Sequence, residues 1–226
     1  MSRPVVILMV KAPRAGQAKT RLAPALSEED AASLAACFAR DALAHARRVV
    51  SEVIVAYTPA DARPLLAELL SGPLIWQEQE GADLGARLEA IAAHAAALGY
   101  GQLLIMGTDS PTLPASFTLM ARDALAAGDA DIALGPTEDG GYYLVGLRHP
   151  TPGIFQNVDW STPRAYQQTA SNAASLNLRL LRLPPWYDVD TPQDFARLQH
   201  ELNTNAQAQE LAPATHHWLK KKEARG

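Results

Sequence analysis

Residues 5–22 have the sequence VVILMVKAPRAGQAKTRL. The apolar run 5–10 is rich in β-branched residues and ends at a polar loop, which predicts a buried strand of an α/β sheet. The loop carries four cations within eleven residues, and it leaves the carboxyl end of the strand, where open α/β sheets bind ligands. Lysine and arginine side chains suit a phosphate chain. We therefore predict a phosphate-binding loop, with a solvated basic loop as the alternative.

This loop does not fit the two common glycine-rich phosphate motifs. Lys19 and Thr20 match the end of the P-loop pattern, but that pattern requires glycine where Pro13 and Ala18 stand. The dinucleotide-binding glycine fingerprint is absent from the sequence as well. The prediction of a phosphate-binding loop rests on its charged side chains, with Gly16 giving the backbone flexibility.

The alternation of strand and helix signals continues along the chain. Short apolar runs predict further strands at 53–57, 74–76, 103–106, 132–134, 142–147 and 178–183. Periodic stretches predict helices at 28–48, with Ser27 as N-cap, and at 61–71, 83–98, 115–127, 162–174 and after Pro192. We predict one α/β domain, residues 1–203, with a mostly parallel mixed sheet flanked by helices on both faces. The Asn/Gln/Ala mixture and the lysines of residues 204–226 predict a flexible tail.

Composition narrows the possible functions. Hydrophobic residues make up 48% of the chain and charged residues 19%, so most of the chain can bury a core. The formal net charge of −4 argues against nucleic-acid binding. The single cysteine, Cys37, excludes an internal disulfide and a cysteine-based zinc site. The first apolar run is too short for a membrane span or a signal sequence, so we expect a cytoplasmic protein.

Three acidic motifs follow predicted strands or precede a predicted helix. GTDSP at 107–111 places Asp109 at a strand end, where a carboxylate suits a hard cation such as Mg²⁺; capping of the next turn is the alternative. GPTEDGGYY at 135–143 predicts a tight turn beside a ligand, or only a hairpin corner. DVDTP at 188–192 could complete the site of Asp109, or Asp190 or Thr191 could simply cap the following helix.

Together these motifs resemble a known family. Four of them, in this order, match the bacterial glycosyltransferase-A-type group of small nucleotide-dependent transferases, whose relatives include phospholactate guanylyltransferases and sugar-acid cytidylyltransferases. The four are KAPRAGQAKTRL at 11–22, QEGADLGAR at 79–87, GTDSP together with EDGGYYLVG at 138–146, and DVDTP. The resemblance spans about residues 5–200 and implies a glycosyltransferase-A-like fold.

The resemblance also implies roles for individual residues. Those expected to hold the nucleotide are Lys11, Gly16, Lys19 and Arg21 at the phosphates, and Asp83, Gly85 and Arg87 beside the base and ribose. Asp109 is expected to bind the metal, with Asp188 or Asp190 as the second carboxylate. Glu138, Asp139 and Gly140 are expected to face the acceptor, and the expected catalytic residues are Asp109, Glu138, Asp139 and Lys19.

Two reactions fit these expectations, and both need Mg²⁺ or Mn²⁺. We expect transfer from a nucleotide-diphospho-sugar to a small-molecule acceptor. The alternative is nucleotidyl transfer, in which pyrophosphate leaves a nucleoside triphosphate. Glycosyltransferases of this fold commonly show D-x-D, whereas Thr108-Asp109-Ser110 has one acid. Sugar-nucleotide pyrophosphorylases commonly show a G-x-G-T-R-type loop, whereas this loop has Ala-Lys-Thr-Arg. The third hypothesis is that the protein is a noncatalytic nucleotide-binding module.

Overall fold

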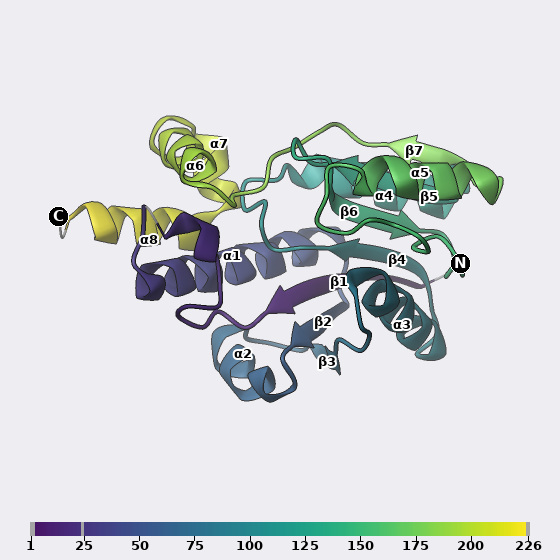
Figure 1. Cartoon of the computed structure of the whole chain (residues 1–226), viewed down its shortest axis with the longest axis horizontal. Helices are drawn as coiled ribbons and strands as arrows, with labels where there is room; N and C mark the ends of the chain where they lie inside the picture. Colours follow the sequence, from purple (N-terminus) through teal and green to yellow (C-terminus); the bar gives the residue numbers. More distant parts are fainter. Residues whose placement is uncertain (1–2, 24, 225–226) are drawn as a thin grey trace.

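A computed structural model describes residues 3–23 and 25–224 of the chain. It contains a seven-stranded sheet with the order β3-β2-β1-β4-β6-β5-β7 (Figure 1). The strands are β1 (Arg3–Lys11), β2 (Val53–Thr58), β3 (Ile75–Glu78), β4 (Tyr100–Met106), β5 (Ile132–Pro136), β6 (Tyr142–Leu147) and β7 (Leu180–Arg182). The helices are α1 (Glu28–Val49), α2 (Arg63–Leu69), α3 (Leu84–Ala97), α4 (Ala115–Ala127), α5 (Ala165–Ser175), α6 (Pro192–Thr204), α7 (Ala206–Leu211) and α8 (Pro213–Glu223).

The predicted sheet type is confirmed. β1 is parallel to both of its neighbours, β2 and β4, and β3 and β7 are also parallel to the strands they join. β6 runs antiparallel to β4 and β5, because a tight turn at 137–141 joins β5 directly to β6 as a hairpin. The sheet is therefore mixed but mostly parallel.

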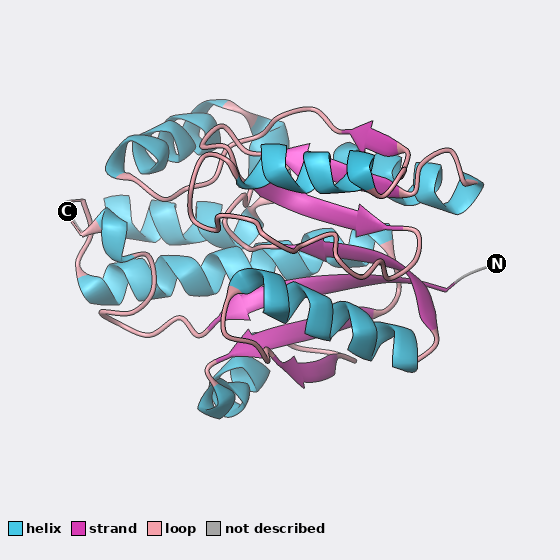
Figure 2. Cartoon of the chain, turned by 45° about the vertical axis from the view of Figure 1, so that its right-hand side comes forward, coloured by secondary structure: helices cyan, strands magenta, loops and turns pink. Residues whose placement is uncertain are grey.

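Helices cover both faces of the sheet, as the alternating pattern predicts (Figure 2). Buried side chains of α1, α2 and α4 pack on one face, and those of α3 and α5 pack on the other. The central strand β1 is buried on both sides, which explains its continuous apolar run. α1 begins where predicted, because Ser27 accepts a hydrogen bond from the Asp30 backbone and three acids occupy the first turn.

The C-terminal segment differs from the flexible tail that we expected for 204–226. Residues 206–211 and 213–223 form α7 and α8, and α8 lies along α1. Asp41 of α1 accepts hydrogen bonds from the backbone of Ala214 at 2.9 Å and Thr215 at 2.9 Å, which caps α8. Leu219 and several small alanines are buried there in a third hydrophobic cluster. Small buried side chains give only a weak hydrophobic pattern in the sequence, so the composition of this segment wrongly indicated a flexible tail.

Two neighbouring parallel strands position the functional loops. β1 ends at Lys11 and β4 ends at Met106, so the basic loop and GTDSP leave the same edge of the sheet. No helix in the described ranges is long and apolar enough to cross a lipid bilayer.

Candidate active site

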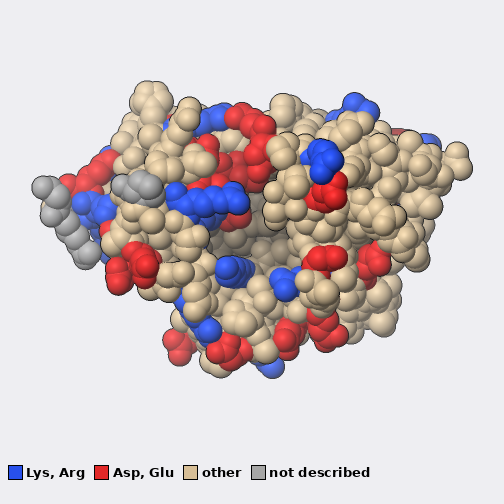
Figure 3. All heavy atoms as spheres, in the orientation of Figure 1, with Lys and Arg blue, Asp and Glu red and all other residues tan. Residues whose placement is uncertain are grey.

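A cleft of about 790 Å³ opens at this edge of the sheet. Figure 3 shows the hollow, with basic and acidic side chains along its rim. The lining comes mainly from the segments 17–21, 107–109, 139–142, 160–165 and 188–190. All three acidic motifs singled out in the sequence therefore meet the basic loop in one place.

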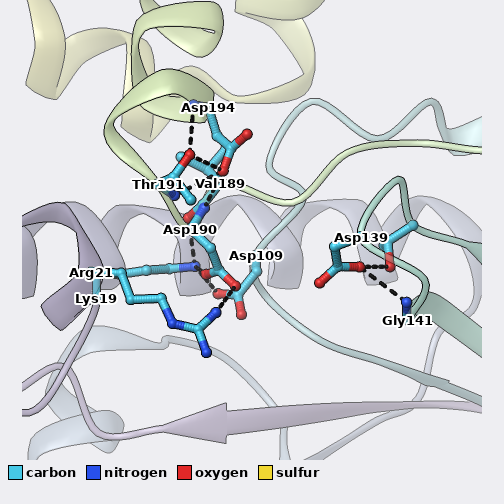
Figure 4. Close-up of polar contacts among 10 residues, drawn as sticks. Lys19, Arg21, Asp109, Asp139, Gly141, Val189, Asp190, Thr191 and Asp194 are labelled. Atoms are coloured by element: carbon cyan, nitrogen blue, oxygen red, sulfur yellow. Dashed lines mark hydrogen bonds and ion pairs between the residues drawn. The ribbon is translucent and has the colours of Figure 1, made fainter. Parts of the chain in front are cut away.

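Lys19 lies at the centre of the acidic side of the cleft (Figure 4). Its ammonium nitrogen is 2.6 Å from Asp109 Oδ1 and 2.8 Å from Asp190 Oδ1. It also donates to the carbonyl oxygen of Val189 at 2.8 Å. Burial alone lowers the pKa of Lys19, but the two carboxylates outweigh burial, so its pKa is raised. Lys19 is therefore a buried, charged ammonium between two aspartates.

The other cations of the basic loop differ in their surroundings. Lys11 and Arg21 line the cleft. Arg21 is 72% exposed and approaches Asp190 Oδ2 only to 3.8 Å. Arg14 turns away and pairs with Asp61 at 2.9 Å. Lys11 and Arg21 are thus the two loop cations that remain accessible to a ligand in the cleft.

The DVDTP motif both caps a helix and contributes to the cleft. Thr191 is the N-cap of α6 and forms a capping box with Asp194, so helix capping is assigned to these two residues. Asp190, directly before them, directs its carboxylate to Lys19 instead (Figure 4). The two interpretations of this motif therefore apply to different residues.

Asp188 is the most perturbed carboxyl group in the cleft. Burial, together with the nearby charges of Asp109 and Asp139, raises its pKa to about 7, although a hydrogen bond from Ser110 and the charge of Lys19 act in the opposite direction. Such a concentration of negative charge is typical of sites that bind cations or transfer protons.

Asp139 forms the corner of the β5–β6 hairpin and also lines the cleft. Its Oδ1 accepts hydrogen bonds from Thr137 Oγ1 at 2.6 Å and from the Gly141 backbone at 3.0 Å (Figure 4). Gly140 has φ of +90°, and a Cβ there would lie 2.3 Å from the carbonyl oxygen of Pro163, so only glycine fits this turn. The hairpin-corner interpretation and the ligand-facing one are compatible.

Glu138 lies outside the cleft lining. Its carboxylate pairs with Arg197 of α6 at 2.8 Å and is 57% exposed. The Arg197 guanidinium also stacks 3.8 Å over the Tyr187 ring. Glu138 therefore connects the hairpin to α6, and Asp139 is the acid of this pair that the fold brings to the cleft.

The residues expected beside the base and ribose have local structural contacts. Asp83 caps α3 by accepting from the Ala86 backbone at 2.8 Å. Arg87 Nε donates to the Gly81 carbonyl at 3.2 Å. A Cβ on Gly85 would lie 2.8 Å from Trp160 Nε1, so glycine permits close packing there. Of this segment only Leu84 lines the cleft, and Gly16 does not line it either.

An aromatic wall, formed by Tyr142 and Trp160, stands in the same cleft. The two rings meet edge to face with centroids 6.2 Å apart. The next residue, Ser161, has φ of +61°, a strained conformation that is frequent near ligands. The sequence interpretation missed Trp160, because it lies in an irregular Pro- and polar-rich stretch without periodicity; the lone tryptophan in that stretch was the available signal.

The donor set fits a divalent cation only in part. No group of three His, Cys, Asp or Glu side chains in the described ranges is arranged to hold a metal ion. Mg²⁺, however, is commonly held by one or two carboxylates together with substrate phosphates. Asp109 and Asp188 fit that smaller requirement, since their charges act on each other and both line the cleft.

The sequence matches one known protein family. The model of a bacterial protein family described as "Uncharacterized protein conserved in bacteria (DUF2064)" matches residues 41–162. No curated protein matches the chain by sequence.

Solved structures match over nearly the whole chain. One, from Desulfovibrio desulfuricans G20 and described as a "putative nucleotide-diphospho-sugar transferase", is 31% identical, covers 99% of this chain and 96% of its own, and has a TM-score of 0.89. CMP:2-keto-3-deoxy-manno-octonic acid synthetase complexed with CTP is 12% identical over 89% of this chain and 99% of its own, with a TM-score of 0.54. Rv0371C from Mycobacterium tuberculosis H37Rv, in complex with manganese, is 17% identical over 87% and 97%, with a TM-score of 0.50.

Proposed function

Since the chain belongs to the bacterial family DUF2064, we propose that it is a metal-dependent transferase of glycosyltransferase-A type. Its fold is that of the Desulfovibrio desulfuricans G20 protein to which it is similar, and a nucleotide-diphospho-sugar is the proposed donor. The observation that carries the proposal is the convergence of Asp109, Asp188 and Asp190 with the basic loop at one edge of the sheet. A small molecule is the proposed acceptor.

Lys11 and Arg21 are proposed to bind the diphosphate of the donor. Both line the cleft, and Arg21 is largely exposed there. An ammonium supplies a point charge and a guanidinium supplies a fork of donors, which together suit the oxygens of two linked phosphates. Positive charge at this position stabilises the diphosphate as it leaves the sugar.

Asp109 and Asp188 are proposed to hold Mg²⁺ or Mn²⁺ together with the donor phosphates. The charges of Asp109 and Asp139 oppose ionisation of Asp188, and a nearby cation relieves that repulsion. A divalent ion there supplies positive charge that offsets the charge developing on the departing diphosphate. The carboxylates would fix the position of that ion, and through it the position of the donor phosphates in the cleft.

Asp139 is proposed to accept the proton of the attacking hydroxyl group. Among the described residues its hydrogen bonds involve Oδ1, so Oδ2 is available to a ligand in the cleft. Glu138, the other candidate, is engaged by Arg197 outside the cleft. Transfer of the hydroxyl proton to a carboxylate makes the acceptor oxygen a better nucleophile.

Nucleotidyl transfer is the second candidate. In that reaction an acceptor phosphate or carboxylate attacks the α-phosphorus of a nucleoside triphosphate, and pyrophosphate leaves. Two observations favour it: the accessible pair Lys11 and Arg21, which suits a departing pyrophosphate, and the similarity in fold to a synthetase complexed with CTP.

A thermal-shift panel distinguishes these reactions. Nucleotide-diphospho-sugars and nucleoside triphosphates are added singly, each with and without Mg²⁺ or Mn²⁺. A ligand at a hundred times its dissociation constant adds about 2.7 kcal/mol to the free energy of unfolding. Metal-dependent stabilisation by a nucleotide-diphospho-sugar supports glycosyl transfer, and stabilisation by a triphosphate alone supports nucleotidyl transfer.

Asp109→Asn is the variant that tests the site itself. It keeps the shape of the side chain but removes its charge, so metal-dependent stabilisation should disappear. Asp123→Asn is the matched control, because Asp123 is an exposed residue of α4 that pairs with its neighbour Arg122. Unchanged stabilisation of the Asp109→Asn protein contradicts the proposed site.

A further inference from the structure

The ammonium group of Lys19 has all of its hydrogen-bond donors occupied. A lysine ammonium has three N–H groups and no acceptor. Three oxygens surround it: Asp109 Oδ1 at 2.6 Å, Asp190 Oδ1 at 2.8 Å and the Val189 carbonyl at 2.8 Å. The side chain is only 7% exposed. No N–H group of Lys19 is therefore left for a phosphate while these contacts are in place.

The backbone around Lys19 is shaped to make these contacts. Lys19 has φ of +50° and ψ of +39°, a left-handed conformation that is unfavourable for a residue with a long side chain. Its neighbours in the loop are anchored, since Ala18 and Leu22 are buried. Strain of this kind persists where surrounding contacts fix it, so the loop is built to direct Lys19 inward.

Lys11 differs from Lys19 in each of these respects. It is exposed at the end of β1, and its side chain has no hydrogen bond or ion pair with the described residues. Binding a phosphate to Lys11 breaks no contact within the protein. Binding one to Lys19 would leave two carboxylates without their counter-charge in a partly buried place, which is unfavourable.

We propose that Lys19 is a positioning residue whose ammonium group is a built-in cation holding Asp109 and Asp190 together. The point between these two carboxylates is thus occupied by the protein itself. A divalent ion would then be held by Asp109 and Asp188, and the ligand phosphates would be bound by Lys11 and Arg21. The last two statements rest on the proposed function; the role of Lys19 rests on its contacts alone.

Mn²⁺ binding without nucleotide tests this role. Lys19→Met removes the ammonium and leaves two carboxylates and a carbonyl oxygen converging on one point, so Mn²⁺ affinity, measured by electron paramagnetic resonance, should rise about tenfold. Lys221→Met, at an exposed lysine of α8 that does not line the cleft, is the matched control, and its Mn²⁺ affinity should equal that of the wild type. Mn²⁺ affinity that is unchanged in folded Lys19→Met protein overturns the proposal.

Chemical labelling of the wild-type protein gives a second test that needs no variant. The chain has five lysines, at 11, 19 and 220–222, so reductive methylation can be followed at each by peptide mass spectrometry. Lys19 should react at least about tenfold more slowly than Lys11, because all its donors are engaged. Inorganic pyrophosphate should slow the labelling of Lys11 alone. Equal reactivity of the two lysines, with equal protection by pyrophosphate, overturns the proposal.

The two tests separate this inference from the proposed function. If nucleotides and pyrophosphate protect neither lysine, the proposed function fails at its phosphate-binding step. Slow labelling of Lys19 and the gain of Mn²⁺ affinity in Lys19→Met would still support the role of Lys19, since neither measurement requires a nucleotide.

Discussion

The backbone amide of Val189 donates a hydrogen bond to the carbonyl oxygen of Asp109 over 2.9 Å. This contact joins the loop after β4 to the segment before α6, and Lys19 then bridges the carboxylates on either side of it. The acidic side of the cleft is thus held both by a main-chain hydrogen bond and by the ion pairs of Lys19. The carboxylates of Asp109 and Asp190 are therefore held in place before a ligand arrives.

Glu138 and Asp139 should differ in their importance for transfer. Asp139→Asn keeps the oxygen that accepts from Gly141 but removes the charge, so turnover should fall by about 10²–10⁴-fold if it is the general base. Glu138→Gln should retain most of the turnover, because Glu138 pairs with Arg197 outside the cleft. The measurement is the initial rate with the donor that the thermal-shift panel identifies. Equal losses in the two variants would contradict the assignment.

Trp160 should report on occupation of the cleft. Its ring lines the cleft beside Tyr142, so a bound ligand should change its fluorescence. Trp160→Phe should lose the ligand-dependent change in emission. Trp218→Phe is the control, since Trp218 lies on α8 and donates to Ser33, and it should keep the change. A signal that disappears with Trp218 instead would place the ligand elsewhere.

His45 should make the protein less stable in acid. Burial, together with the charge of Arg48, lowers the pKa of His45 to about 4 in the folded protein, against about 6.5 when unfolded. Above pH 6.5 it is neutral in both states and has no effect. As pH falls from 6.5 to 4 only the unfolded chain takes up the proton, so the free energy of unfolding drops by about 3 kcal/mol.

Urea unfolding at several pH values checks this dependence. His45→Gln can keep the hydrogen bond to Thr118 but cannot titrate, so its stability should fall less steeply between pH 6.5 and 4. His200→Gln, at an exposed position of α6, should keep the wild-type profile. Parallel profiles for the wild type and His45→Gln would show that His45 is not the group responsible.

Asp41 should be important for the attachment of α8. Asp41→Ala leaves the backbone N–H groups of Ala214 and Thr215 without their acceptor in a buried place. The free energy of unfolding should fall by about 2 kcal/mol, as measured by the urea midpoint. Asp123→Ala, at an exposed position of α4, should change it by less than about 0.5 kcal/mol. A loss of similar size in both variants would contradict this role.

Much of the fold could be predicted from the sequence, because its strands are continuous apolar runs and α1 begins at a clear capping residue. The helix at 115–127 and the strand at 142–147 have the predicted boundaries, and the others shift by a few residues. α7 and α8 were missed, since their buried contacts involve small alanines and a capping aspartate far away in the sequence. Local patterns do not encode such long-range partners.

The candidate site was predictable at the level of motifs but less so at the level of side chains. Charged residues directly after a predicted strand indicate the edge of the sheet where Lys19 and Asp109 lie. The DVDTP motif adds Asp190 to the same site. It does not reveal that one ammonium satisfies both carboxylates, because that depends on the left-handed backbone at Lys19. Glu138 and Asp139 are adjacent in sequence, yet the turn sends one to Arg197 and the other to the cleft.

The third hydrophobic cluster joins the beginning and the end of the described chain. Leu22 and Leu26 follow the basic loop, Val189 lies between the two aspartates of DVDTP, and Leu219 belongs to α8; all four share this cluster. During synthesis, β1, β2 and β4 can pair before residues 206–223 have been made. The third hydrophobic cluster cannot be completed at that stage, because it includes Leu219 of α8. A growing chain can thus pair these strands early, whereas the cluster that contains Leu22 and Val189 is complete only after α8 has left the ribosome and docked on α1.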